Sequence, residues 1–389
     1  MREEINVETK SLLNVEDFHQ LAKQVLPKMI YDFYDTGSDD NVTLIDNRAA
    51  YERIKLRPKV FVDVSIHSTN DLSCKTTILN STTISFPCII APTALHRLAN
   101  QDGELATVRA AVRSNTIMIV STMASTRMEL IAEEHQKTMM EYKTSSSALW
   151  YQLYVLENRE YTKNLIQRAE KCGYKALVIT VDACVIGNRE CDHHNNFQLP
   201  NGISYGNFLS DENNKSCAEK DVPTYYTHPF DTSLSWNDLE WFRSVTKLPL
   251  IIKGIIHPDD AVLAVKANVA GIIVSNHGGR QLDTCMSTID ALADIMQAVR
   301  PLNTNMEIYM DGGIRRGTDI LKAISLGAKA VCIGRPVLWG LSADGEKGVK
   351  HVLDILKKEF KLAMMLCGCQ TVNELDKSLL HTTTLTSKL

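Results

Sequence analysis

Gly271-Ile-Ile-Val-Ser-Asn-His-Gly-Gly-Arg-Gln-Leu-Asp283 is a short apolar run that ends abruptly in polar residues and two glycines. The apolar part, Gly271–Val274, predicts a buried strand, and the polar part predicts a loop at its end. His277 can exchange a proton near neutral pH, and Arg280 can hold a carboxylate by two parallel hydrogen bonds. A base next to an anion clamp predicts a site for an acidic substrate. The alternative is a solvated loop in which both side chains are incidental.

The pattern recurs along the chain as short apolar runs, each followed by a polar or glycine-bearing loop and an amphipathic segment. Eight strands are predicted, at Phe86–Ala91, Ile117–Ser121, Trp150–Val155, Ala176–Val181, Leu250–Gly254, Gly271–Ser275, Glu307–Asp311 and Ala330–Gly334. Helices are predicted at Gly103–Asn115, Arg127–Glu134, Asn158–Cys172, Pro258–Ala267, Thr288–Val299 and Arg316–Leu326. Strands that alternate with helices indicate a parallel sheet. Eight units in about 250 residues predict an α/β fold of the closed (β/α)8 TIM barrel type, with a doubly wound open sheet as the alternative.

Three segments lie outside this repeat. Residues 1–85 are predicted as a helical and extended preface. Residues 192–246, between the fourth and fifth strands, are predicted as a long insertion that is partly mobile and covers the substrate. Helices at Gly348–Leu366 and Val372–Leu380 are expected to close the fold. We therefore expect one domain, residues 1–389, in which the barrel takes 86–345, the closing helices 346–380 and a tail 381–389.

Composition and charge exclude several classes of partner. The chain has 389 residues, of which 44% are hydrophobic and 23% charged, so it can bury a large core. A formal net charge of -4 gives no basic field for nucleic acid, and no dense Lys/Arg block marks a membrane surface. No run of about eighteen apolar residues is present, and the acidic start does not resemble a signal peptide. We expect a protein that acts on small molecules and is not secreted.

Ser387-Lys388-Leu389 matches the tripeptide that the peroxisomal import receptor recognises. We therefore expect a peroxisomal location, with the import receptor as a partner. The alternative is a chance tripeptide.

Glycines and arginines cluster after the seventh and eighth predicted strands, in Asp311-Gly-Gly-Ile-Arg-Arg-Gly317 and in Gly334-Arg335. Glycines let backbone N–H groups approach an anion, and a helix N-terminus adds its dipole. Barrels of this kind commonly bind phosphate at these two loops. The pattern predicts a phosphate-bearing ligand. The alternative is glycines that end helices and arginines at the surface.

Four further side chains near strand ends leave more than one use open. Lys253 could neutralise an anionic cofactor ring, form a Schiff base or make an ion pair. Asp182 could orient His277 and stabilise its charge, or it could cap a helix. Arg189 is a second candidate carboxylate clamp or a surface charge, and Tyr154 could donate to a substrate oxygen or only pack.

One cluster suggests a metal site, namely Cys191, Asp192, His193 and His194. Adjacent histidines point apart, and no partner pair has ligand spacing. No metal site is therefore predicted.

Together these residues resemble the FMN-dependent L-2-hydroxy acid oxidases, a family that includes glycolate oxidase, lactate oxidase and the flavin domain of flavocytochrome b2. The most specific shared signature is Ser275-Asn-His-Gly-Gly-Arg-Gln-Leu-Asp283, and the similarity covers essentially the whole chain. Gly187-Asn188-Arg189, Ser235-Trp-Asn-Asp-Leu239 and Gly334-Arg-Pro-Val-Leu-Trp-Gly-Leu341 are similar to a peroxisomal subgroup that acts on medium- and long-chain 2-hydroxy acids. The resemblance implies FMN as cofactor, a homotetramer or homo-octamer, and oxidation of an (S)-2-hydroxy acid to the 2-oxo acid with reduction of O2 to H2O2.

The resemblance also implies roles for single residues. His277 would be the catalytic base and Asp182 its charge partner. Arg189 and Arg280 would hold the substrate carboxylate, and Tyr154 would bond a substrate oxygen.

For the cofactor, the resemblance implies contacts with both the flavin and the phosphate of FMN. The flavin contacts would be Pro92, Thr93, Ala94, Ser121, Gln152, Thr180, Lys253 and Ser275. The phosphate contacts would be Asp311, Gly312, Gly313, Ile314, Arg315, Gly334 and Arg335. Lys253 would then lie at the N1–C2 oxygen edge, where a positive charge stabilises the reduced flavin.

Two positions depart from the glycolate-specific members of the family. Phe33 stands where they carry a tyrosine, and Met123 where they carry a tryptophan. Losing a hydroxyl and a large ring makes the pocket more apolar and adaptable, which predicts a medium- or long-chain, or aromatic, 2-hydroxy acid. The alternatives are a glycolate- or lactate-preferring oxidase, an FMN dehydrogenase with another electron acceptor, and a flavin-binding scaffold without catalysis.

Overall fold

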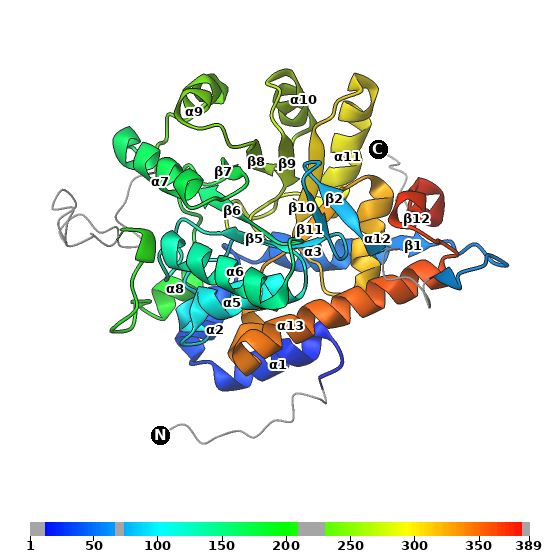
Figure 1. Cartoon of the computed structure of the whole chain (residues 1–389), viewed down its shortest axis with the longest axis horizontal. Helices are drawn as coiled ribbons and strands as arrows, with labels where there is room; N and C mark the ends of the chain where they lie inside the picture. The colour runs from blue at the N-terminus through cyan, green and yellow to red at the C-terminus, as the bar shows by residue number, and fades with distance from the viewer. Residues whose placement is uncertain (1–11, 67–73, 209–229, 383–389) are drawn as a thin grey trace.

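The core of the protein is a closed barrel of eight parallel strands (Figure 1). The computed structural model describes residues 12–66, 74–208 and 230–382. Around the barrel the strand order is β10-β11-β4-β5-β6-β7-β8-β9. The strands are β4 (Cys88–Ile90), β5 (Ile117–Val120), β6 (Ala148–Leu153), β7 (Leu177–Thr180), β8 (Leu250–Ile255), β9 (Gly271–Val274), β10 (Glu307–Asp311) and β11 (Ala330–Ile333). The prediction of a closed barrel is confirmed, and the open-sheet alternative is wrong.

Helices follow the strands and cover the outside of the barrel. They are α5 (Gly103–Arg113), α6 (Met128–Tyr142), α7 (Arg159–Lys171), α9 (Leu239–Val245), α10 (Pro258–Lys266), α11 (Thr288–Val299), α12 (Gly317–Leu326) and α13 (Arg335–Leu366). The outward residues of the strands, such as Ile252, Ile272 and Val331, are buried in the layer between strands and helices. None of the helices in the described ranges is long and apolar enough to cross a membrane.

The predicted insertion at 192–246 contains more regular structure than expected. Helix α8 (Glu190–His194) runs into it, and α9 takes the place of the helix between β7 and β8. Residues 209–229, on which the prediction of mobility mainly rested, lie outside the described residues.

The interior of the barrel is filled by alternate residues of the strands, because successive side chains point to opposite faces. Large inward side chains include Trp150, Ile251 and Tyr309, which are fully buried. A hairpin of β2 (Thr76–Ile78) and β3 (Thr82–Ile84) adds Ile78 and Ile84 to the same cluster. Two residues further along most of the strands, toward their C-terminal ends, the inward positions become polar, as at Gln152, Thr180 and Lys253, and the candidate site begins there.

The preface and the end of the described chain pack together. The preface contains α1 (Val15–Val25), α2 (Lys28–Asp35), α3 (Val42–Arg53) and β1 (Ile54–Leu56). Strand β1 pairs antiparallel with β12 (Leu380–Thr382). The prediction of a closing helix at Val372–Leu380 is wrong: the segment forms two 3-10 turns, at Val372–Glu374 and Lys377–Leu379, and then enters β12. The other closing helix, predicted at Gly348–Leu366, is the second part of α13, which is interrupted by non-helical backbone at Asp344 and Gly345.

Helix α3 is hydrogen-bonded to the loop that follows β9, which we call the His277 loop (residues 275–283). The side-chain amides of Asn47 and Asn276 exchange two hydrogen bonds, of 2.9 and 2.8 Å. Oδ1 of Asn47 also accepts from the backbone N–H of Thr288 at 3.2 Å. Gly279 has φ +74°, and a Cβ there would lie 2.7 Å from the backbone nitrogen of Leu44, so this approach requires glycine. The preface is therefore part of the support of the site.

We expect Asn47→Ala to lower the free energy of unfolding by about 1–3 kcal/mol, because it leaves the amide of Asn276 and the N–H of Thr288 buried without their partner. Thermal and urea unfolding measure the change. Asn237→Ala, at an exposed asparagine, is the matched control and should be nearly neutral. Equal stability of the two variants would show that the contact with α3 does not hold the loop.

Candidate active site

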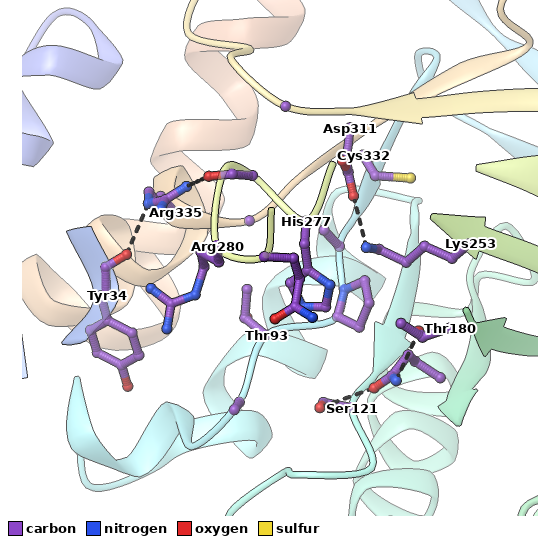
Figure 2. A pocket seen from close by; sticks show the side chains of 18 of the residues that line it. Tyr34, Thr93, Ser121, Thr180, Lys253, His277, Arg280, Asp311, Cys332 and Arg335 are labelled. Carbon is purple, nitrogen blue, oxygen red and sulfur yellow. Dashed lines mark hydrogen bonds and ion pairs between the residues drawn. The ribbon is translucent and has the colours of Figure 1, made fainter. Parts of the chain in front are cut away.

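A cavity with an empty volume of about 1230 Å³ lies at the C-terminal ends of the barrel strands (Figure 2). Most residues that the sequence predicted for the site form its wall: Pro92, Thr93, Ala94, Ser121, Gln152, Tyr154, Thr180, Arg189, Lys253, His277, Arg280, Asp311, Gly312, Gly313, Ile314, Arg315, Gly334 and Arg335. The two others, Asp182 and Ser275, bond directly to the wall residues His277 and Lys253. The structure thus brings residues from all eight strand ends into one site.

His277 is held between a carboxylate and a phenol. Its Nδ1 is 2.9 Å from Oδ1 of Asp182, and its Nε2 is 3.1 Å from the hydroxyl of Tyr154. Its φ of +57° is in the left-handed region, which is uncommon for residues with a side chain. Gln281 holds Asp182 in place, because Nε2 of Gln281 donates to the backbone carbonyl oxygen of Asp182 at 2.9 Å. The contact with Asp182 favours the tautomer with the proton on Nδ1, which leaves Nε2 as the acceptor on the Tyr154 side.

Burial and charge set the protonation of this pair. Burial lowers the pKa of His277, the positive charge of Lys253 adds to the effect, and Asp182 opposes it. Burial alone would raise the pKa of Asp182, but His277 and Lys253 outweigh it and the pKa is lowered. Near neutral pH the pair is therefore a neutral imidazole beside an ionised carboxylate. In this state Nε2 can accept a proton.

Lys253 is an inward-facing residue of β8, and its side chain lies at the floor of the cavity. Its Nζ donates to Oγ of Ser275 at 2.9 Å and lies 3.3 Å from Oδ2 of Asp311. Burial acts to lower the pKa of Lys253, but Asp311 and Asp182 outweigh burial and raise it above its usual range. A lysine that stays protonated is unsuited to form a Schiff base and suited to neutralise an anionic ring.

Next to Lys253, the floor of the cavity is a chain of neutral polar groups. Oε1 of Gln152 accepts from Oγ of Ser121 at 3.2 Å, and Nε2 of Gln152 donates to Oγ1 of Thr180 at 3.0 Å. Figure 2 shows this chain and the Lys253–Asp311 pair on the same floor. These groups fit the polar edge of a planar heterocycle.

Two guanidinium groups line the cavity near the imidazole. Nη1 of Arg280 donates to the carbonyl oxygens of Phe33 and Thr36, at 2.7 and 2.9 Å, so helix α2 sets its direction. Nε of Arg189 lies 3.5 Å from the carbonyl oxygen of Arg280. Asp192, which the sequence analysis considered only as a possible metal ligand, is buried near them. Burial raises the pKa of Asp192, and the charges of Arg280 and Arg189 act against that rise. The arrangement fits a substrate carboxylate.

The end of the cavity next to α12 and α13 is short of negative charge. Burial lowers the pKa of Arg315 to about 10 and that of Arg335 to about 9. Within the described ranges neither forms an ion pair, and Nε of Arg315 has no hydrogen-bond partner. Arg335 donates to the carbonyl oxygens of Tyr34, Thr36 and Gly278. Two of these hydrogen bonds tie its guanidinium group to the preface.

A helix N-terminus adds to this positive end. Helix α13 begins at Arg335, its N-cap is Gly334, and no side chain caps it. Pro336 has no N–H, and the N–H of Val337 donates to the carbonyl oxygen of Gly334 at 2.9 Å, which leaves the N–H of Arg335 without an intrahelical acceptor. Gly312 and Gly313 have positive φ and line the cavity beside Arg315. Together with the buried guanidinium of Arg315, this chemistry fits a phosphate group.

One wall of the cavity is apolar. Phe33 and Met123, the two departures from the glycolate-specific pattern, are buried and line it. The rings of Phe33 and Phe197 stack with centroids 4.5 Å apart, and those of Tyr154 and Phe230 stack at 4.8 Å. Sequence reasoning missed Phe230, because it is one of several aromatic residues in the long insertion and belongs to no periodic pattern.

Gln281 was also missed as a functional residue, although it lies within the quoted signature. Nothing in the local sequence around Gln281 indicates that its side chain bonds to Asp182, which lies far away in the chain. In the residues that the structure describes, no group of three or more His, Cys, Asp or Glu side chains is arranged to hold a metal ion.

The chain matches the family of FMN-dependent dehydrogenases over residues 22–382. It is 45% identical over 376 residues to 2-hydroxyacid oxidase 1 of Homo sapiens, which covers 95% of this chain and 96% of that protein. It is 45% identical over 371 residues to a peroxisomal (S)-2-hydroxyacid oxidase of Arabidopsis thaliana, covering 95% and 97%. Among solved structures, a mutant flavocytochrome b2 with pyruvate bound is similar, with a TM-score of 0.84, 34% identity, and coverage of 98% of this chain and 89% of that chain.

We expect Arg315→Met to weaken FMN binding about tenfold to hundredfold, because a hydrogen bond to a charged group contributes about 1.5–3 kcal/mol. Quenching of FMN fluorescence on titration into the apoprotein measures the affinity. Arg316→Met is the matched control, since Arg316 is half exposed and pairs with Glu359. Equal affinities of the two variants would contradict a phosphate site at Arg315.

Proposed function

Because this chain belongs to the family of FMN-dependent dehydrogenases and is an FMN-dependent 2-hydroxyacid oxidase, we propose that its substrate is a medium- or long-chain, or aromatic, (S)-2-hydroxy acid. The proposal includes membership of the hydroxyacid oxidase 2 subgroup. Its products are the 2-oxo acid and hydrogen peroxide. The observation that carries it is the position of the imidazole of His277 between Asp182 and Tyr154, in a cavity that also holds two guanidinium groups and an apolar wall.

In the proposed mechanism, FMN when bound supplies the chemistry that accepts two electrons from the substrate. Nε2 of His277 takes a proton from the CH–OH group of the substrate, and Asp182 stabilises the imidazolium that results. Tyr154 donates to a substrate oxygen from the same side. Lys253 keeps a positive charge under the floor of the cavity as negative charge develops there. These roles hold whether the substrate loses a hydride or first forms a carbanion.

Arg189 and Arg280 hold the substrate carboxylate in this proposal. The hydrogen bonds from Arg280 to the backbone of Phe33 and Thr36 fix its direction before substrate binds, which reduces the entropy lost on binding. At position 33 the ring has no hydroxyl to assist the clamp, so the two guanidinium groups carry the carboxylate.

The preference for larger substrates is supported by the apolar wall. Phe33, Met123 and Phe230 contribute rings and a flexible thioether where a small acid such as glycolate would leave apolar surface uncovered. A glycolate- or lactate-preferring oxidase is the alternative. A dehydrogenase with another electron acceptor and a scaffold without catalysis are further alternatives, and stoichiometric formation of peroxide would exclude both.

We also propose a peroxisomal location and a homotetramer or homo-octamer. The location is supported by the peroxisomal relatives and by Ser387-Lys388-Leu389, which lies outside the described residues. The oligomer is supported by the family resemblance. The division of the chain into one domain of residues 1–389 is part of the same proposal.

Anaerobic flavin reduction tests the substrate class. With glycolate, lactate, 2-hydroxyoctanoate, 2-hydroxypalmitate and mandelate, we expect the rate to be highest for the larger acids, because only they cover the apolar wall. In His277→Asn the rates should fall by about 10²–10⁴, since the proton acceptor is lost. Fastest reduction by glycolate would favour the small-acid alternative, and no reduction by any of the acids would favour the scaffold.

The pH dependence tests the role of Asp182. Because burial lowers the pKa of His277, the acid limb of kcat/KM should lie below the usual imidazole pKa of about 6.5. Asp182 raises that pKa toward its usual value, so Asp182→Asn should move the acid limb to still lower pH while kcat falls. An acid limb that moves to higher pH in the variant would contradict Asp182 as the charge partner of His277.

A further inference from the structure

A second cavity, with an empty volume of about 960 Å³, lies outside the barrel wall at β7 and β8. It is bounded on one side by outward residues of these strands and on the other by the turn and helix before β8. Apolar residues that form its wall include Ile179, Ile252, Leu234, Trp236, Leu239 and Phe242. The roles assigned above for catalysis and cofactor binding leave this space without a use.

The two cavities share part of their walls. Thr180, Ala183 and Phe230 line both of them. The ring of Phe230 stacks on that of Tyr154 with centroids 4.8 Å apart, and the hydroxyl of Tyr154 bonds His277. A substituent that extends from the reacting carbon past Tyr154 therefore meets Phe230 and the small side chain of Ala183, and beyond them the second cavity.

The polar groups of the second cavity determine what it can accept. Asp231 is buried, and its Oδ2 accepts from Nε of Arg159 at 2.7 Å. Asp260 adds a second carboxylate to the wall. In the part of the chain that the structure describes, no lysine or arginine lines this cavity. A neutral apolar group fits such a wall, whereas an anionic group would meet two carboxylates, one of them paired with Arg159, and no lysine or arginine in the wall itself.

We infer that the second cavity binds the distal alkyl chain of a 2-hydroxy acid whose carboxylate lies at Arg189 and Arg280, with Phe230 and Ala183 as the passage between the cavities. The inference rests on the proposed function and specifies it further. Chain-length preference is then set by residues outside the barrel and not by the catalytic groups. Leu234, which lines only the second cavity, becomes a specificity-determining residue.

Measurements on the wild-type holoenzyme come first. Binding of butanoate, hexanoate and octanoate, measured by isothermal titration calorimetry, should strengthen about fourfold per methylene, the gain expected for burial of a CH2 group. The value of kcat/KM should rise likewise from 2-hydroxybutanoate to 2-hydroxyoctanoate. The dicarboxylate 2-hydroxyoctanedioate should be at least tenfold poorer than 2-hydroxyoctanoate, because its far carboxylate enters the apolar wall. Independence of chain length, or equal use of the dicarboxylate, would overturn the inference.

Leu234→Trp fills the second cavity and is the decisive variant. We expect at least a tenfold loss of kcat/KM for 2-hydroxyoctanoate with lactate unchanged, and weaker binding of octanoate by the same factor. Leu263→Trp, at an exposed leucine of α10, makes the same substitution outside the cavity and should change neither. An equal effect of Leu234→Trp on lactate and 2-hydroxyoctanoate would overturn the inference alone. Failure of the wild type to oxidise any 2-hydroxy acid would overturn the proposed function and the inference with it.

Discussion

The hydrogen bonds between helix α3 and the His277 loop are the constraint on which the site depends. His277 has a left-handed backbone conformation that costs free energy, so surrounding contacts must hold it. The amide pair of Asn47 and Asn276 holds the loop on the preface side, and Gln281 holds it on the side of Asp182. The direction of Nε2 thus follows from contacts that span the preface, the barrel and the segment after β7. A site of this precision requires such support from several elements.

Charge is distributed unevenly around the cavity, and this distribution determines which ligand groups each end can bind. At the end of the cavity that contains Lys253, Asp311 and Asp182 balance its charge, and Lys253 is therefore a stable cation. At the opposite end, Arg315 and Arg335 are partly buried without an ion pair in the described residues, and burial lowers the pKa of each. A folded protein keeps such unpaired buried cations at a cost, and an anionic ligand offsets that cost when it binds. The positive end therefore favours a bound phosphate.

Much of the fold and of the site was predictable from local sequence patterns. The apolar runs from Phe86 to Gly334 gave the eight strands, and the period of two along each strand explains why Gln152, Thr180 and Lys253 share the inner face. Long-range contacts were not predictable in the same way. The 372–380 segment has helix-like spacing but forms two 3-10 turns and enters β12 at Leu380, where β1 offers an edge to pair with. Phe230 and the Asn47–Asn276 pair join positions whose proximity depends on the closed barrel, and no local pattern encodes that.

The two-stranded sheet of β1 and β12 has a mechanical consequence. In this sheet, β1, the strand directly after α3, pairs antiparallel with β12, the last described strand of the chain. Tension that separated β12 from β1 would reach α3 first, and through the paired amides it would reach the loop that orients the imidazole. Separation of β1 and β12 would therefore loosen the arrangement around His277 before the barrel itself opened.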